Sequence, residues 1–336
     1  EMTRWYSLEM VSLGGEVHFY IRCPQKQRSM VESAFNSYYP DVEVEEADDY
    51  INGLPATMDD LLDQGMSMYG REIKLAKDPI YPLKTYIDFE VPDDDIQLVD
   101  PVSSLLELLG KIKEEEFMAV QMNIVPDELN WGEKFSTAVD KLRENKGDIT
   151  PDVSDFTKLV IKTPGQIKIL TAVEEKLAMP VFDTIIRLMY VAPKISFTKE
   201  LVKNGLMGAF NQYSTLSMNG FMPNFKAGSS VDRHVSPYVF PKLRTKVREK
   251  RFYHNFLTRE IPNTEFMAGI LSSNIFNWNT HSKFSKLSTA ELATIFHPPT
   301  HVVLTAPHIA RIESKKAGPP AGLPIFSDDS SLDEFR

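Results

Sequence analysis

The sequence predicts an α+β protein made of two related strand-helix-strand units of ferredoxin-like type, with a basic insertion and a C-terminal linker. A strand, a helix and a second strand follow one another in residues 14–46, and the same order returns from residue 181. The predicted domains are a first α+β region at 1–126, a connection at 127–165, a second α+β unit at 166–312 with an insertion at 223–262, and a linker at 313–336.

The first unit opens with a predicted β-hairpin. Gly14 and Gly15 can supply the positive φ angles of a tight turn, and apolar and polar residues alternate in the strand after them. Pro24 ends this strand. Apolar residues then recur at helical spacing, at Met30, Val31, Ala34, Phe35 and Tyr38. The segment DVEVEEA, from residue 41, alternates as a second strand.

A second β/α layer is predicted within the first half. Two short strands are expected around Pro79 and Pro82, and Asp100 is a candidate N-cap with Pro101 at the first helical position. The apolar stripe of that helix is Val102, Leu105, Leu106 and Leu109. The run FMAVQMNIV, from residue 117, predicts the next strand.

The second half repeats the opening theme. After predicted helices in residues 131–145 and 166–178, the strand LMYVAPK resembles FYIRCPQK, and GAFNQYST resembles SAFNSYYP at the matching place. This correspondence predicts an internal duplication. Near the end, LSTAELATIF predicts a short helix with a capping box from Ser288 to Glu291.

Composition excludes several classes of protein. The 336 residues carry a net charge of -10, which disfavours binding of nucleic acid by the whole surface. The single cysteine, Cys23, permits no intrachain disulfide and no cysteine-based structural zinc site. No apolar run reaches the roughly 20 residues of a membrane span. Because the sequence begins at Glu1, we expect a fragment, with room for an anchoring segment upstream.

Motifs for catalysis are not apparent in the sequence. It contains no phosphate-binding loop with lysine after the second glycine and no Gly-x-Ser-x-Gly turn. His297 and His301 are four residues apart, but two prolines between them break a helix, so a turn is favoured over a metal site. Cys23 has no signalled base, and the carboxylate groups EVEEADD and PDDDIQ lack calcium-loop spacing. We therefore predict no cofactor, no metal and no enzymatic activity.

One segment differs from the rest in charge. Between residues 242 and 259, seven cations and one acid, Glu249, give a local charge of +6. Phe252, Tyr253 and Phe256 are interleaved at its end. The candidates for contact with a polyanion are Lys242, Arg244, Lys246, Arg248, Lys250, Arg251 and Arg259. The alternative is that these cations pair with the acidic loops of the same chain.

Three stretches carry a resemblance to a known family. The opening SLEMVSLGGEVHFYIRCPQKQRSMVESAFNSYYPDVEVEE is similar to the start of a domain of candidate-phyla bacteria, and LSTAELATIFHPP and ARIESKKAGPPAGLPI are similar to its end. In that family the domain precedes a phosphate-loop ATPase motor and resembles the N-terminal accessory domain of type IV secretion and conjugative-transfer ATPases. The resemblance covers nearly the whole chain, but the motor is absent from it, so no catalytic residue can be carried over.

The resemblance implies a non-catalytic assembly or docking domain. Its implied partners are subunits of secretion or conjugation machinery, the downstream ATPase domain, and DNA or the anionic membrane; an oligomer is compatible with it. The implied location is the cytoplasmic side of the inner membrane, with a soluble fragment anchored through an upstream segment. Two alternatives stay open: a stand-alone nucleic-acid-binding protein that uses residues 242–259, and an enzyme with an unrecognised site.

Overall fold

The structure is a computed structural model of the 336-residue chain. It describes residues 5–40, 42–89, 100–127, 131–144, 163–231, 240–262 and 281–299. The predicted linker at 313–336 and the segment PDDDIQ lie outside these residues.

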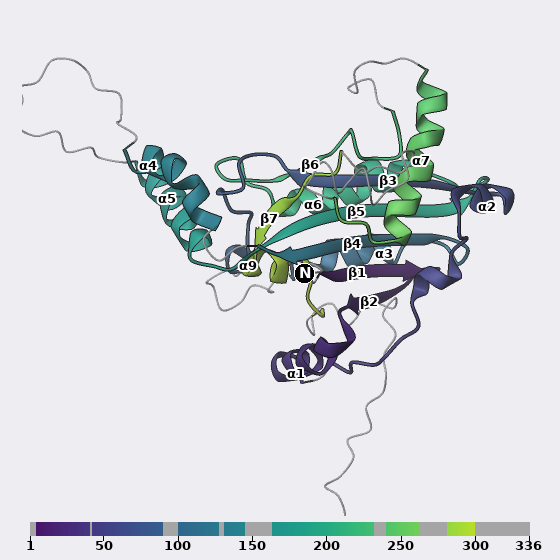
Figure 1. Cartoon of the computed structure of the whole chain (residues 1–336), viewed down its shortest axis with the longest axis horizontal. Helices are drawn as coiled ribbons and strands as arrows, with labels where there is room; N and C mark the ends of the chain where they lie inside the picture. The colour runs from purple at the N-terminus through teal and green to yellow at the C-terminus, as the bar shows by residue number, and fades with distance from the viewer. Residues whose placement is uncertain are drawn as a thin grey trace, which may run out of the picture.

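The described residues form one antiparallel sheet with helices on both faces, which confirms the predicted α+β class (Figure 1). The strand order is β2-β1-β4-β5-β3-β6, and β7 pairs with β5 beside the end of β3. The strands are β1 (Tyr6–Leu13), β2 (Glu16–Arg22), β3 (Met66–Leu75), β4 (Phe117–Pro126), β5 (Val181–Pro193), β6 (Phe221–Pro223) and β7 (Ser285–Ser288).

The predicted hairpin is confirmed in β1 and β2. Gly14 and Gly15 have φ angles of +62° and +94°, so the turn uses backbone conformations that other residues rarely adopt. A Cβ on Gly14 would also lie 2.8 Å from the carbonyl oxygen of Glu114. The turn therefore needs glycine for its dihedral angles and for its close packing against the segment before β4.

The predicted pair of ferredoxin-like units is not confirmed. The connectivity β3-α3-β4-β5-α6-β6, with the strand order β6-β3-β5-β4, is instead that of a single split βαβ arrangement. Its helices are α3 (Ser103–Leu109) and α6 (Met207–Phe210), the latter preceded by a π-helical turn at Leu201–Leu206. This arrangement spans both predicted halves, and the β1–β2 hairpin extends its sheet beyond β4.

The first copy of the expected duplication lacks its second strand. After β2 and helix α1 (Arg28–Tyr38), residues 42–49 have no regular structure, so the predicted strand there was wrong. Alternation of valine with glutamate satisfies the strand pattern locally. Among the described residues, however, β2 pairs only with β1, and residues 42–49 pair with neither strand. Residues 181–223 do contain strand, helix and strand, with β5 in the centre of the sheet.

Several local predictions are confirmed, with shifted boundaries. The stripe of α3 is buried, and Asp100 accepts a hydrogen bond from the Val102 amide at 2.9 Å, although the helix itself begins at Ser103. The two strands expected near Pro79 and Pro82 are replaced by the single long β3 and a loop. The helices α4 (Ser136–Glu144), α5 (Pro164–Leu177) and α9 (Thr289–Ile295) lie where helices were predicted.

The two faces of the sheet are covered by different helices. Along β1, Met10 belongs to the core under α3, α6 and α9, while the next residue, Val11, belongs to the core under α2 (Met58–Asp63) and α7 (Pro241–Leu257). This alternation is the period-2 geometry of a strand that is buried on both faces. Helices α4 and α5 pack together around Trp131 at one end of the sheet, and α1 lies beyond β2 (Figure 1).

The segment 223–262, predicted as an insertion or long loop, contains the 17-residue helix α7. The loop prediction was wrong for this part because a high density of cations hid the helical spacing of Phe252 and Phe256, both of which are buried.

Candidate interaction surfaces

The C-terminal half of α7 is held tightly against β3. Phe252 is 2 % exposed, and a Cβ placed on Gly70 would lie 2.0 Å from its Cε1 atom. The absence of a side chain at Gly70 therefore lets the aromatic ring reach the strand backbone. Ser229 fixes the same point, since its hydroxyl accepts a hydrogen bond from the Gly70 amide at 2.9 Å and its own amide donates to the Gly70 carbonyl oxygen at 2.9 Å.

A buried arginine of the central strand caps the C-terminal end of α7. Arg187 donates to the carbonyl oxygens of Asn255 at 3.2 Å and Glu260, and Gln121 donates to the carbonyl oxygen of Phe256 at 3.1 Å. The carbonyls of Asn255 and Phe256 belong to the last turn of α7, where such groups have no partner inside the helix, and that of Glu260 follows the helix. Burial lowers the pKa of Arg187, and the nearby Glu72 carboxylate, 4.0 Å away, opposes that shift.

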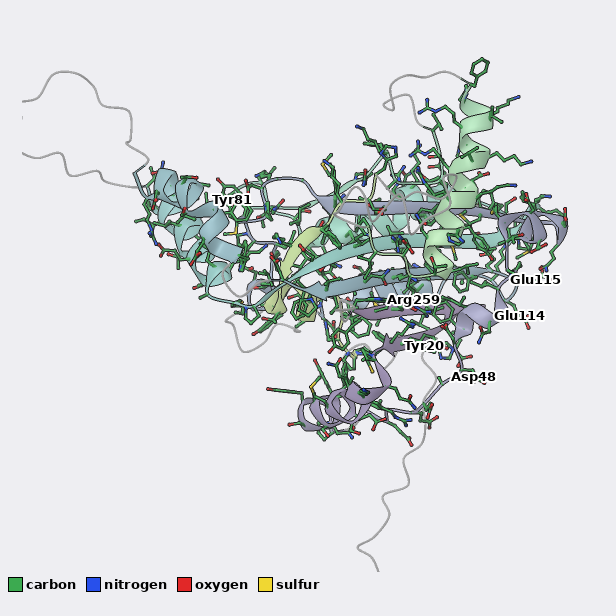
Figure 2. The ribbon with its side chains drawn as sticks, in the orientation of Figure 1. Tyr20, Asp48, Tyr81, Glu114, Glu115 and Arg259 are labelled. Atoms are coloured by element: carbon green, nitrogen blue, oxygen red, sulfur yellow. The ribbon has the colours of Figure 1, made fainter. Side chains whose placement is uncertain are left out.

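Arg259 forms a second anchor immediately after α7. Its guanidinium contacts both oxygens of Glu9, at 2.6 and 3.0 Å, and both oxygens of Asp49, at 2.7 and 2.9 Å. Glu9 is fully buried in β1. Burial acts to lower the pKa of Arg259, but the hydrogen bonds to Asp49 and Glu9 outweigh it and hold the pKa above its ordinary value. Figure 2 shows Arg259 beside the central strands.

The predicted cations do not form one free surface. Arg248 donates to the carbonyl oxygens of Gly228 and Phe225, and Arg251 to that of Lys226. Lys250 pairs with Asp59 of α2 at 2.5 Å. Together with Arg259, the four predicted residues from Arg248 onward contact groups of this chain. Of the acidic segments expected as internal partners, EVEEADD contributes Asp49.

The other three predicted cations lie in the N-terminal half of α7, which projects away from the sheet (Figures 1 and 2). Lys242 and Lys246 are exposed, while Arg244 is half-buried and makes a contact within the chain. Apolar side chains are exposed beside them: Phe240 (74 %), Leu243 (66 %) and Val247 (47 %). Their spacing places them on one stripe of the helix. We call Phe240 to Val247 the α7 tip.

The sequence prediction missed this stripe. It placed Phe252, Tyr253 and Phe256 beside the cations of the predicted polyanion-binding segment, but all three are buried against the sheet. The signal was present as apolar residues at positions 240, 243 and 247, on a different side of the helix from the buried ones.

Helix α1 is the second candidate surface. None of its residues is buried. Of the predicted apolar positions, Val31 and Phe35 are half-buried, whereas Met30 and Tyr38 are 59 % and 81 % exposed, with the exposed Ala34 between them. Four-residue spacing aligns these three side chains, so α1 presents an apolar stripe to solvent.

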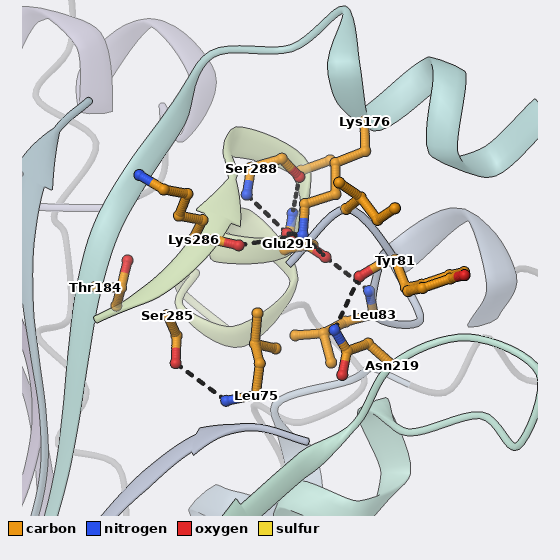
Figure 3. A network of polar contacts seen from close by, with 12 residues as sticks. Leu75, Tyr81, Leu83, Lys176, Thr184, Asn219, Ser285, Lys286, Ser288 and Glu291 are labelled. Carbon is orange, nitrogen blue, oxygen red and sulfur yellow. Dashed lines mark hydrogen bonds and ion pairs between the residues drawn. The ribbon is translucent and has the colours of Figure 1, made fainter. Parts of the chain in front are cut away.

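A buried lysine-glutamate pair is the most enzyme-like feature (Figure 3). The Nζ atom of Lys176 in α5 lies 2.9 Å from Oε2 of Glu291 in α9, and both side chains are almost fully buried. Burial lowers the pKa of Lys176, and the attraction of Glu291 opposes this shift. Glu291 also accepts hydrogen bonds from the amides of Leu83 at 2.6 Å and Ser288 at 2.7 Å. The pair therefore joins α5, α9 and the loop after β3.

A hollow of about 430 Å³ lies beside this loop. It is lined by Lys77, Tyr81, Leu142, Gln166, Ile169, Leu170 and Ser217. Lys77 already donates to the carbonyl oxygen of Leu216 at 2.8 Å. The lining includes no nucleophile paired with a base, so its geometry does not define a reaction.

The histidines and the cysteine considered as candidates in the sequence can now be compared with the structure. His297 lies 2.9 Å from the Asp100 carboxylate and 2.9 Å from the carbonyl oxygen of Ala293, while His301 is outside the described residues. Cys23 is partly exposed after β2. In the described ranges, no group of three or more His, Cys, Asp or Glu residues could hold a metal ion. Nor does any helix within them have the length and hydropathy needed to cross a membrane.

A family model matches most of the chain. The model of a family described as a domain of unknown function, DUF8128, matches residues 3–235, which include the sheet strands β1 to β6. No curated protein and no solved structure matches the chain.

Proposed function

Because the chain belongs to the DUF8128 family, whose description assigns no activity, we propose its function from its surfaces: a non-catalytic docking domain of a type IV secretion or DNA-transfer ATPase. The observation that carries this proposal is helix α1, which has no buried residue and exposes Met30, Ala34 and Tyr38 along one side. Exposed apolar side chains gathered on one face are typical of sites of protein association.

The arrangement of buried charges supports a structural role over catalysis. Glu9 with Arg259 and Glu291 with Lys176 are paired inside the protein and connect elements far apart in sequence. Such pairs also perturb pKa values in proteins without any catalytic role. The alternative of a stand-alone nucleic-acid-binding protein is less favoured, because Arg248, Arg251 and Arg259 are directed into the protein.

The proposed partners are subunits of the secretion or conjugation machinery and the ATPase motor, with the domain held at the cytoplasmic side of the inner membrane by a segment upstream of Glu1. The sequence resemblance motivates these partners. The exposed stripe of α1 offers a surface to which a subunit could dock.

Affinity purification of the full-length native protein tests the proposal. We expect secretion or conjugation subunits to be enriched with the wild-type protein and depleted, by about tenfold or more, with the Met30→Glu/Tyr38→Glu variant, because charges placed in a desolvated contact are strongly unfavourable. The matched control is Ile195→Glu, at a fully exposed apolar side chain outside α1.

Equal recovery of those subunits with both variants would exclude α1 as the docking surface. Recovery of no secretion or conjugation subunit with the wild-type protein would contradict the proposed function itself. Thermal unfolding of both variants checks that the fold is intact.

A further inference from the structure

The α7 tip combines an apolar stripe with positive charge. Phe240, Leu243 and Val247 are exposed, and Lys242 and Lys246 are exposed between them. From Phe240 to Arg248 the sequence contains no carboxylate. This differs sharply from the whole chain, which has a net charge of -10.

The remainder of α7 anchors the helix from which the tip projects. Phe252 and Phe256 are buried against the sheet, Arg187 caps the helix end, and Arg259 joins the following residues to β1. The tip therefore extends from a packed base, and Figure 1 shows the N-terminal half of α7 projecting beyond the sheet. A surface approached by this end of the protein meets the stripe and its lysines together.

We propose that the α7 tip binds an anionic lipid surface, with Phe240, Leu243 and Val247 entering the headgroup region and Lys242 and Lys246 contacting lipid phosphates. The inference does not depend on the proposed secretion or DNA-transfer partners. Apolar side chains flanked by cations are the composition with which helices bind membrane interfaces. Each exposed cation adds attraction to an anionic leaflet.

A lipid surface fits this tip better than a nucleic acid. Single-stranded nucleic acids need aromatic platforms for base stacking as well as cations. Tyr253, Phe252 and Phe256 are buried, so Phe240 is the aromatic residue that the tip itself exposes. Phosphate contacts alone would leave Leu243 and Val247 in water, whereas the headgroup region accommodates both the charged and the apolar side chains.

A fluorescent probe at the tip tests the proposal directly. Because Cys23 is the only cysteine, a Cys23→Ser/Leu243→Cys protein can be labelled with an environment-sensitive NBD group at one position. With phosphatidylcholine vesicles that contain phosphatidylglycerol, we expect a blue shift and an increase in emission. The matched control, Cys23→Ser/Ile195→Cys, carries the probe at a fully exposed apolar position outside α7 and is expected to show neither change.

A second experiment tests whether vesicle binding depends on the two lysines. In co-sedimentation with the same vesicles, Lys242→Ser/Lys246→Ser is expected to weaken binding by about tenfold or more. The control Lys199→Ser/Lys203→Ser removes the same charge outside α7 and should have little effect. Binding should also weaken as salt is raised.

Three results would overturn the proposal: no blue shift at position 243, the same shift at positions 243 and 195, or equal binding by the two lysine variants. A blue shift produced by single-stranded DNA in place of vesicles would reassign the tip to nucleic acid. Unchanged thermal unfolding of the variants ensures that lost binding reports the surface and not the fold.

Discussion

Replacing Arg259 by methionine is expected to destabilise the protein by about 3–5 kcal/mol, because it leaves a buried carboxylate without its counter-charge. Arg259 contacts both Glu9 and Asp49, but the two acids differ in exposure: the Glu9 side chain is fully buried, whereas that of Asp49 is 38 % exposed. Water can solvate Asp49 after the change. Glu9 would still accept a hydrogen bond from the hydroxyl of Ser7. The expected loss of stability is therefore at the lower end of the range, about 3 kcal/mol.

Urea unfolding followed by circular dichroism measures this loss. The matched control is Lys250→Met, whose pair with Asp59 is exposed on both sides, at 42 % and 55 %, so little change in stability is expected. The double variant Glu9→Gln/Arg259→Met should be more stable than the sum of the single changes predicts, by about 1 kcal/mol or more. The reasoning would be refuted if Arg259→Met cost no more than Lys250→Met, or if the double variant were simply additive.

The other predictions concern packing and burial. Gly70→Ala should lower stability by about 1–3 kcal/mol because the added Cβ overlaps the ring of Phe252. Gly53→Ala should not show this loss, because a Cβ added there has no atom within 4 Å. The urea midpoints of the two variants measure the difference. Lys176→Met should lower stability by about 3–5 kcal/mol, because it leaves the buried Glu291 without its counter-charge. The control is Lys111→Met, which removes an exposed ion pair, and an equal loss of stability in the two variants would contradict this prediction. Burial raises the pKa of Glu249 to about 6, above its ordinary 4.5, so ionisation destabilises the fold as pH rises through this window. Glu249→Gln should therefore raise the free energy of unfolding by about 1 kcal/mol at pH 7, allowing for partial screening by solvent, and should not change it below about pH 4.5. A gain in stability that does not depend on pH would contradict this assignment.

The local elements of the fold could be predicted because their signals are local. Gly14 and Gly15 specify the turn of the hairpin, the apolar run before Pro126 specifies a buried strand, and Ser288 with Glu291 forms the predicted capping box. The order of strands could not be predicted in the same way. It depends on pairings such as β5 with β7, between residues more than a hundred positions apart.

The candidate surface was only partly predictable for a related reason. A run of cations suggests a common environment, but neighbours on a helix point in different directions. Arg248 shares the inward side of α7 with Phe252 and reaches backbone carbonyls, whereas Lys246 is exposed. Reading the segment at helical spacing separates these two groups. The partner of Arg259, 250 residues away in β1, could not be identified from spacing at all.

Site-specific photo-crosslinking at position 38 tests the central claim, docking through α1, most directly. A photoreactive amino acid in place of Tyr38, in the native full-length protein inside its own cells, should form crosslinks with a subunit of secretion or conjugation machinery. The same group in place of Ile195, which is fully exposed and lies outside α1, should not form those crosslinks. Crosslinking to such a subunit from position 38 is the predicted result; its absence, or identical products from both positions, would contradict the claim.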